Sequence, residues 1–242
     1  EADSELPKIV IGMDYFEPYS YQASDGEYKG IDVELAKEAF RRLGYRPKFE
    51  NIVWEDKDEL LAEGTIDCLW SSYSMNGRED KYQWAGPYLY SRQMVVVKNE
   101  SEIQTLSDLK GKRIAVQATT KAEDLFLHNI KSDLPQMQQV NCFSTTNEIY
   151  AALRKSYVDA IAGHEAMLGS LVKEGKDAYR MLDESIYKSE LGVAFKKGTH
   201  EEVAADLTET LKKLQREGIT EKIVTKYGLD ADEILPEGEQ NE

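Results

Sequence analysis

The chain has 242 residues, of which 41% are hydrophobic and 31% are charged. A chain of this length and composition can bury a core without disulfides or metals, and it is too apolar to be disordered. Its 30 basic and 45 acidic residues give a net charge of −15. Such an acidic surface repels phosphate backbones and anionic lipids, which argues against a nucleic-acid or membrane-surface partner.

The first half of the chain alternates short apolar segments with amphipathic ones, which predicts alternating strands and helices. Asp32, in Gly30-Ile31-Asp32, is the expected N-cap of the first helix, and Gly44 ends that helix. Strands are expected at 8–12, 47–52 and 66–70, and helices at 32–43 and 56–63.

The second half repeats this alternation, so the chain is predicted to be an α/β protein with mostly parallel sheets. Strands are expected at 113–117, 138–143, 158–162 and 191–195. Helices are expected from Thr119 or Thr120 to Ile130, from Thr145 or Thr146 to Lys155, at 164–173, from a Thr199 cap to Gly218, and at 220–227. In such sheets, ligands bind at the carboxyl ends of the strands.

The two cysteines, Cys68 and Cys142, lie in apolar, strand-like stretches and are expected to be buried free thiols. Neither cysteine nor histidine spacing suggests a metal, and no cofactor is expected. No catalytic motif such as Gly-x-Ser-x-Gly or a P-loop occurs. No apolar run is long enough to span a membrane. Because the chain begins at Glu1 without Met, an upstream signal segment is expected to have been removed.

Two clusters of candidate binding residues follow strands of the first half. Residues 14–21, which include Asp14 and Phe16, hold four aromatic side chains that would form either the floor of a ligand pocket or a packed loop. The second cluster consists of Ser71, Ser72, Ser74 and Arg78. It would bind a carboxylate, because hydroxyls and a guanidinium suit that group. Alternatively, Arg78 would pair on the surface with Glu79 or Asp80.

Two further clusters follow strands of the second half. Thr119 and Thr120 precede a helix, where they would either help to hold an anion or serve as ordinary N-caps. His164 and Glu165 follow a later strand. The histidine would be a proton switch, a ligand contact, a catalytic base or a hydrogen-bonded structural residue.

Taken in order, the motifs resemble those of the family 3 extracellular solute-binding proteins, which serve polar amino-acid ABC transporters. The resemblance runs from about Lys8 to Gly228. Its landmarks are Gly30-Ile31-Asp32-Val33-Glu34, Gly64-Thr65-Ile66-Asp67, Gly77-Arg78-Glu79, Trp84-Ala85-Gly86-Pro87-Tyr88, Leu106-Ser107-Asp108-Leu109-Lys110-Gly111, Val116-Gln117-Ala118-Thr119-Thr120, Val158-Asp159-Ala160 and Lys226-Tyr227-Gly228.

The resemblance implies an α/β, two-lobed type II periplasmic-binding-protein fold with two hinge crossings, near residues 90–94 and 189–193. Lobe 1 would comprise residues 1–91 and 192–242, and lobe 2 residues 92–191. The protein would be a non-enzymatic monomer in the periplasm or a lipoprotein on the outer face of the cytoplasmic membrane. It would capture a polar amino acid or related carboxylate by hinge closure and deliver it to the permease of an ABC importer.

The resemblance also implies roles for individual residues. Phe16 would stack on the ligand side chain, and Trp54 would form the opposite wall. Arg78 would grip the ligand α-carboxylate. Hydroxyls and backbone N–H groups would complete the site, contributed by Ser71, Ser72, Ser74, Thr119 and Thr120.

Three departures from the family pattern bear on the ligand. Asn76-Gly77-Arg78 is one residue shorter than usual, and Ala118 replaces a glycine. His164 stands where the family has an aspartate that pairs with the ligand α-ammonium. Glu165 or Asp14 would then take the ammonium, or the ligand would be a dicarboxylate or another anion.

Two other functions remain open on the sequence. The chain would also suit the ligand-sensing domain of a membrane receptor, such as a histidine kinase or a cyclase. Some dehydratases have a similar fold, and in such an enzyme His164 and Glu165 would be the candidate acid–base pair.

Overall fold

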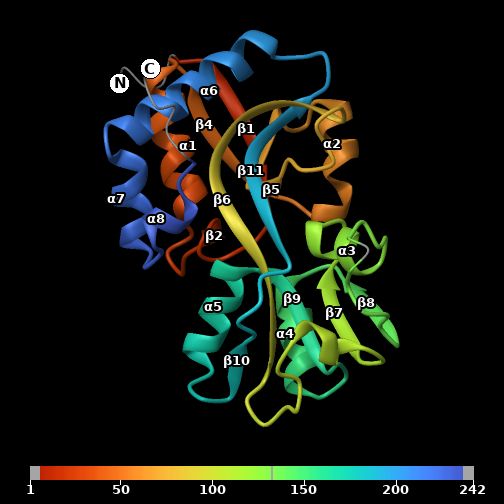
Figure 1. The fold of residues 1–242 in the computed structure, drawn as a ribbon. Coiled ribbons are helices and arrows are strands. Elements are labelled where there is room, and N and C mark those ends of the chain that lie inside the picture. The colour runs from red at the N-terminus through yellow and green to blue at the C-terminus, as the bar shows by residue number, and fades with distance from the viewer. Residues whose placement is uncertain (1–5, 132, 237–242) are drawn as a thin grey trace, which may run out of the picture. The chain divides into compact units, whose positions relative to one another are not determined.

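The computed structural model describes residues 6–131 and 133–236. The chain forms two compact units. Unit 1 comprises Glu1–Tyr90 and Glu190–Glu242, and unit 2 comprises Ser91–Ser189. The chain therefore passes from one unit to the other within two long strands, β6 (Tyr82–Lys98) and β11 (Tyr187–Lys196), which can be followed in Figure 1.

Unit 1 contains a sheet in the order β4-β1-β5-β11, in which β1 pairs in parallel with β4 and β5, and β11 is antiparallel to β5. Its other strands are β1 (Lys8–Met13), β2 (Tyr21–Gln22), β3 (Tyr28–Lys29), β4 (Arg46–Asn51) and β5 (Cys68–Ser74). Its helices are α1 (Ile31–Arg42), η2 (Trp54–Asp56), α2 (Lys57–Glu63), α6 (Glu201–Arg216), α7 (Ile219–Lys226) and α8 (Ala231–Ile234).

The start of α1 differs from the prediction that Asp32 is its N-cap. The N-cap is Gly30, which has a φ of 122°, and a Cβ there would lie 2.2 Å from the carbonyl oxygen of Tyr19. Only glycine fits this position. Asp32 is the second residue of the helix, and its side chain is fully buried.

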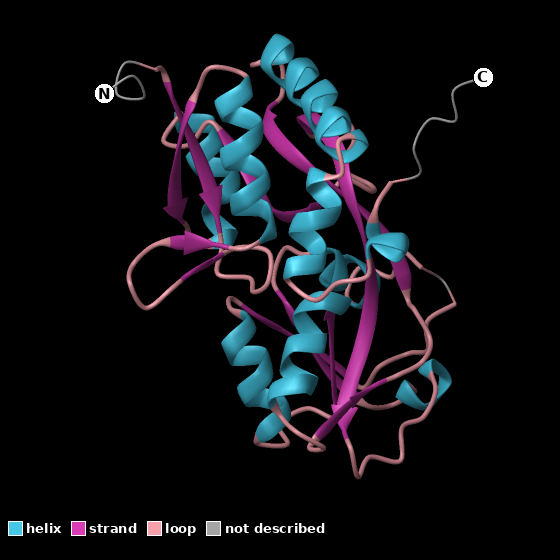
Figure 2. Cartoon of the chain, turned by 90° about the vertical axis from the view of Figure 1, so that its left-hand side faces the viewer, coloured by secondary structure: helices cyan, strands magenta, loops and turns pink. Residues whose placement is uncertain are grey.

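Unit 2 contains a sheet in the order β6-β9-β7-β8, with β10 also paired to β6. β7 pairs in parallel with both β8 and β9. Its other strands are β7 (Arg113–Gln117), β8 (Gln139–Phe143), β9 (Ala160–His164) and β10 (Tyr179–Met181). Its helices are η3 (Leu106–Leu109), α3 (Lys121–Phe126), α4 (Thr146–Arg154) and α5 (Glu165–Glu174), and Figure 2 distinguishes helices from strands by colour.

Two further predicted helix boundaries are wrong. α3 ends at Phe126 rather than Ile130, because Leu127 and Ile130 are exposed and Asn129 has a left-handed backbone, so burial does not extend the helix. The Thr199 hydroxyl donates to the carbonyl of Lys196 instead of capping α6.

The N-cap of α6 is His200, and α8 was not predicted. Among the described residues, none of the helices is both long and apolar enough to cross a bilayer.

The two cysteines differ in exposure. Cys68 is buried in β5, whereas Cys142 is exposed, so its predicted burial is wrong. Cys142 lies on β8, at the end of the sheet order, where a strand has only one neighbour. Both thiols are free, as expected. Partial desolvation and nearby Glu123 raise the pKa of Cys142 to about 11.

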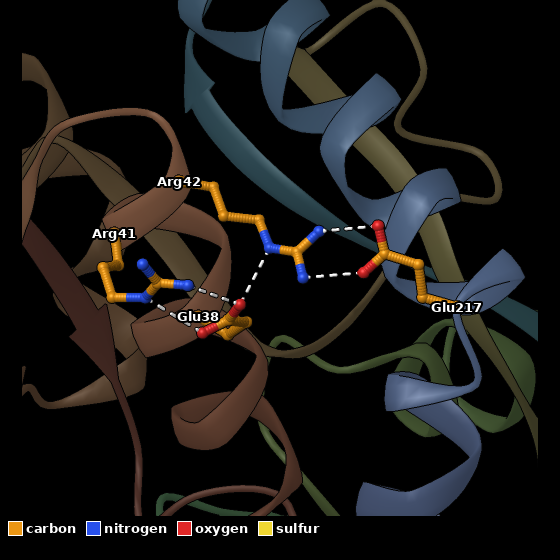
Figure 3. A network of polar contacts seen from close by, with 4 residues as sticks. All are labelled: Glu38, Arg41, Arg42 and Glu217. Carbon is orange, nitrogen blue, oxygen red and sulfur yellow. Dashed lines mark hydrogen bonds and ion pairs between the residues drawn. The ribbon is translucent and has the colours of Figure 1, made fainter.

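A network of charged side chains joins the end of α1 to the end of α6 (Figure 3). Glu38 accepts hydrogen bonds from Arg41 (2.9 and 3.1 Å) and from Arg42 (2.8 Å). Arg42 also donates two hydrogen bonds to Glu217, at 2.7 and 3.0 Å. These bonds hold the pKa of Glu38 and Glu217 below their usual value.

We expect Arg42→Gln to lower the melting temperature by about 1–3 °C in low salt at pH 7, because exposed ion pairs stabilise weakly. Since the pKa values of Glu38 and Glu217 are depressed, their contribution is present above the usual glutamate pKa and lost as the pH falls through the folded-state values. Calorimetric scans should therefore show the difference shrinking as the pH falls below the usual glutamate pKa, and also in 1 M NaCl. A loss that persists in 1 M NaCl would mean that Arg42 acts through packing.

Candidate functional site

In unit 1, the carboxyl ends of β1 and β5 meet at one edge of the sheet, because the two strands are parallel. Asp14 follows β1, and its backbone N–H donates to Ser71 Oγ at 3.2 Å. Ser20 Oγ lies 3.2 Å from Ser71 Oγ and donates to the Asp14 carbonyl at 2.8 Å. The structure thus brings together the predicted residues Asp14 and Ser71 through Ser20, which the sequence analysis did not single out.

β5 is irregular where it carries its serines. Leu69 pairs with Ala194 and Tyr73 with Gly192, so three residues of β5 lie opposite one residue of β11. This is a bulge, and bulges redirect the side chains of the strand that carries them. Within it, Ser72 has a φ of 44°, in the left-handed region that non-glycine residues rarely adopt.

The backbone N–H of Ser72 donates to Asp32 Oδ2 at 2.6 Å, and the Tyr88 hydroxyl donates to Asp32 Oδ1 at 2.8 Å. Burial raises the pKa of the Asp32 carboxyl to about 7, although these two hydrogen bonds act in the opposite direction. A buried carboxylate of this kind is unusual, and carboxylates are seldom fully buried without such partners. Asp32 was predicted only as a helix cap within a motif, so its buried contact with Ser72 was not predicted.

Arg78 lies just beyond the end of β5. Its Nη1 donates to the carbonyl of Ser74 at 3.0 Å, and its guanidinium carbon lies 4.9 Å from the centre of the Tyr73 ring. The Arg78 carbonyl accepts a hydrogen bond from Trp84 Nε1 at 2.9 Å. The side chain is therefore oriented by an aromatic face and a carbonyl, which favours a fixed direction for its remaining N–H donors.

Phe16 and Trp54, the two predicted aromatic walls, are both buried within unit 1. Phe16 stacks on Tyr19, with ring centroids 6.1 Å apart. Trp54, in η2, meets Tyr73 edge to face at 5.1 Å. Trp54 and Arg78 thus both contact Tyr73.

Ser74 Oγ has a different partner from Ser71 Oγ. It donates a hydrogen bond to Asn76 Oδ1 at 3.3 Å, whereas Ser71 Oγ bonds Asp14 and Ser20.

In unit 2, Thr119 and Thr120 follow β7. Thr120 occupies the N-cap position of α3, and its hydroxyl donates to the carbonyl of Gln117 at 2.7 Å. Thr119 has a left-handed backbone, and its N–H donates to Glu123 Oε2 at 2.6 Å. The buried Oγ1 of Thr119 has no hydrogen-bond partner within the described part of the chain.

His164 ends β9, which is the parallel neighbour of β7, so it lies at the same edge of the unit 2 sheet as Gln117. It is buried, and its Nδ1 lies 2.8 Å from Ser91 Oγ and 3.3 Å from Gln93 Nε2. Gln93 Nε2 also donates to Ser189 Oγ at 3.2 Å.

The other candidate of this pair, Glu165, accepts two hydrogen bonds from Arg92, at 2.8 and 2.5 Å. Its carboxylate is thereby neutralised by a bidentate ion pair. Ser91, Arg92 and Gln93 were not predicted, because the register between β6 and β9 brings Ser91 and Gln93 to His164 and Arg92 to Glu165, and no local sequence pattern indicates these contacts. Among the described residues, no three His, Cys, Asp or Glu side chains are grouped so that they could hold a metal ion.

The family model described as bacterial extracellular solute-binding proteins, family 3, matches residues 9–230. This match covers most of the chain, which therefore belongs to that family. The family resemblance expected from the motifs is confirmed, and so is the prediction of an α/β solute-binding fold. The predicted class of function, a solute-binding protein, follows from the same membership.

Individual relatives are distant but similar over nearly the whole chain. The L-cystine-binding protein TcyJ of Escherichia coli (strain K12) is 27% identical over 227 residues, which cover 92% of this chain and 83% of that protein. A substrate-binding protein of an ABC uptake transporter from Streptococcus pneumoniae, solved with bound histidine, is 27% identical with a TM-score of 0.84, covering 92% of this chain and 93% of the other.

A second similar structure is an ancestral amino acid-binding protein described as a precursor of cyclohexadienyl dehydratase. It is 25% identical with a TM-score of 0.80, and the match covers 91% of this chain and 95% of that one.

Proposed function

We propose that this chain binds an α-amino acid or a closely related carboxylate outside the cytoplasm and delivers it, unchanged, to an ABC importer. The similarity to a cystine-binding protein and to a protein solved with bound histidine supports an amino-acid ligand. The similarity to the dehydratase precursor is to a protein that is itself described as amino acid-binding, so it favours binding rather than catalysis.

The observation that carries this proposal is the arrangement at the end of β5 in unit 1. The Arg78 guanidinium, oriented by Tyr73 and the Ser74 carbonyl, stands on the same strand end as the serine hydroxyls. A guanidinium fork and hydroxyl donors match a carboxylate, because they offer several N–H and O–H groups to its two oxygens. We assign the ligand carboxylate to Arg78, with Phe16 and Trp54 in contact with the remainder of the ligand.

The residues of unit 2 offer little to an ammonium group. His164 is a poor partner for a cation, and Glu165 is already paired with Arg92. We therefore propose that Thr119, Thr120 and His164 supply hydrogen bonds to polar ligand atoms. Any ligand ammonium would depend chiefly on Asp14 in unit 1.

We also propose that the two chain crossings, within β6 and β11, act as a hinge and that the monomer closes on its ligand. A ligand favours the closed state only through contacts that the open state lacks. Small-angle scattering should then show a smaller radius of gyration when the ligand is bound.

The experiment that tests the ligand class compares three compounds for each amino acid: the amino acid, its carboxamide and its deaminated acid. We expect loss of the carboxylate to weaken binding at least about thirtyfold, because the carboxylate would lose the Arg78 guanidinium. Loss of the ammonium should weaken binding less than about tenfold, because Asp14 would be its chief partner. His164→Asp should strengthen binding of the amino acid at least about tenfold, but not binding of the deaminated acid.

His128→Asp is the matched control for His164→Asp, because it makes the same substitution at an exposed position of unit 2. Calorimetric titration supplies the dissociation constants. If the amide binds as well as the acid, the assignment of a carboxylate to Arg78 is wrong. If His164→Asp and His128→Asp change affinity equally, His164 does not contact the ligand.

A further inference from the structure

The bulge in β5 leaves the buried backbone N–H of Ser72 in need of a hydrogen-bond acceptor. Three residues of β5 lie where β11 has one, so Ser72 is displaced from the regular ladder of strand hydrogen bonds. Ser72 is also buried and has a left-handed backbone. A buried N–H without a partner is costly, and a left-handed serine persists only when its surroundings hold it.

Asp32, in helix α1, supplies this acceptor. Its backbone is fixed at the start of α1, where its N–H donates to the carbonyl of Tyr19 at 2.9 Å. Its carboxylate, fully buried, receives the Ser72 N–H at 2.6 Å. This bond connects positions 40 residues apart in the sequence. The adjacent Ser71 hydroxyl accepts a hydrogen bond from the N–H of Asp14, so two neighbouring residues of the bulge bond Asp14 and Asp32.

We propose that Asp32 is a positioning residue of the ligand site: by accepting the Ser72 N–H, its buried carboxyl group holds the β5 bulge in the conformation that presents Ser71, Ser72 and Arg78 to the ligand. The link to the ligand rests on the function proposed above. The link between Asp32 and Ser72 does not, because it is a property of unit 1 alone.

The chemistry of the Asp32 pair distinguishes its possible replacements. An asparagine keeps one oxygen for the Ser72 N–H and turns its amide toward the Tyr88 hydroxyl, which then accepts instead of donating. An alanine removes the acceptor of both the Ser72 N–H and the Tyr88 hydroxyl. The titratable groups facing Asp32 are the phenol of Tyr88, from β6, and beyond it the phenol of Tyr19. Burial raises the pKa of Tyr88 well above its usual value, so its phenol stays neutral across the range of the test.

The first test uses the unliganded protein and nuclear magnetic resonance. The amide proton of Ser72 should titrate with a midpoint near pH 7 in the wild type, because Asp32 is its acceptor and has its pKa raised to about 7. Asp32→Asn should abolish this titration and keep the amide protected from hydrogen exchange. Asp32→Ala should make the Ser72 amide exchange at least about tenfold faster.

Leu207→Ala is the matched control for lost stability. Leu207 is a fully buried residue of α6 in unit 1, and its truncation destabilises the unit without touching Ser72. It should leave the Ser72 titration intact. A Ser72 amide that exchanges no faster in Asp32→Ala than in Leu207→Ala, or that titrates equally in the wild type and in Asp32→Asn, would overturn the proposal.

The second test measures affinity for whichever of the twenty L-amino acids or L-cystine binds the wild type most tightly. Asp32→Ala should weaken binding at least about tenfold, while Asp32→Asn stays within about threefold of the wild type and Leu207→Ala leaves binding unchanged. Equal losses in Asp32→Ala and Leu207→Ala would overturn the positioning role. If no amino acid binds the wild type, the proposed amino-acid ligand is wrong, and the exchange rate of the Ser72 amide in Asp32→Ala still decides whether Asp32 holds the bulge.

Discussion

Acidification from pH 8 to pH 5 is expected to raise the free energy of unfolding of the wild type, relative to that of Asp32→Asn, by about 3 kcal/mol. The pKa of Asp32 is about 7 in the folded protein, against an unperturbed value of 3.8, because burial disfavours the carboxylate. A group with a raised folded-state pKa stabilises the fold fully below its unfolded pKa. That stabilisation is lost as the pH rises toward 7.

Denaturant titrations of the two proteins at several pH values provide this measurement. The difference between the proteins cancels the contributions of other titrating groups, such as Glu38 and Glu217, provided that they remain unchanged. At pH 8 the asparagine variant should be at least as stable as the wild type, because it avoids a buried charge. A difference that is independent of pH would show that Asp32 is ionised throughout this range, with a normal pKa.

Arg78→Ala is expected to weaken binding of the amino acid by about 2–5 kcal/mol, or roughly 30-fold to several thousandfold in the dissociation constant. The expected loss is large because the ligand carboxylate would remain desolvated without its guanidinium partner. Arg78→Lys should recover only part of the affinity, since an ammonium cannot donate two parallel hydrogen bonds in the guanidinium geometry. Calorimetric titration at constant salt measures all three proteins.

Arg216→Ala is the matched control for Arg78→Ala, because it removes an exposed arginine from α6 of the same unit. It should bind as the wild type does. Melting temperatures of both variants separate a loss of contact from a loss of fold. If Arg78→Ala binds within threefold of the wild type, another group holds the carboxylate.

The alternation of strands and helices was predictable because apolar patterning is local. The spacing of apolar residues along the sequence predicts which of them are buried. Examples are the strand residues Ile9 and Ile11 and the α6 stripe of Leu207, Leu211 and Leu214. The family was predictable because its motifs keep their order along the chain. Helix boundaries were less predictable where a short polar side chain can form several alternative hydrogen bonds. Thr199, for example, donates to the Lys196 carbonyl instead of capping α6.

The arrangement of the site was only partly predictable. Polar residues after strands marked Ser71 and His164, because the carboxyl ends of parallel strands carry ligands in this fold class. The partners that orient these residues come from remote positions. Asp32 reaches Ser72 across 40 residues, and Ser91 reaches His164 across 73. Such contacts depend on a bulge and on strand register, which local sequence patterns do not specify.

Thermal unfolding in the presence of small solutes tests the central claim, that this chain is an amino-acid-binding protein, most directly. The protein is first unfolded, dialysed and refolded to remove any ligand carried through purification. It is then scanned with each L-amino acid and with L-cystine. A ligand at 100 times its dissociation constant should stabilise by about 2.7 kcal/mol, or about 5–10 °C for a chain of this size. We expect at least one amino acid to give this shift, whereas a cooperative transition that none of them moves would contradict the claim.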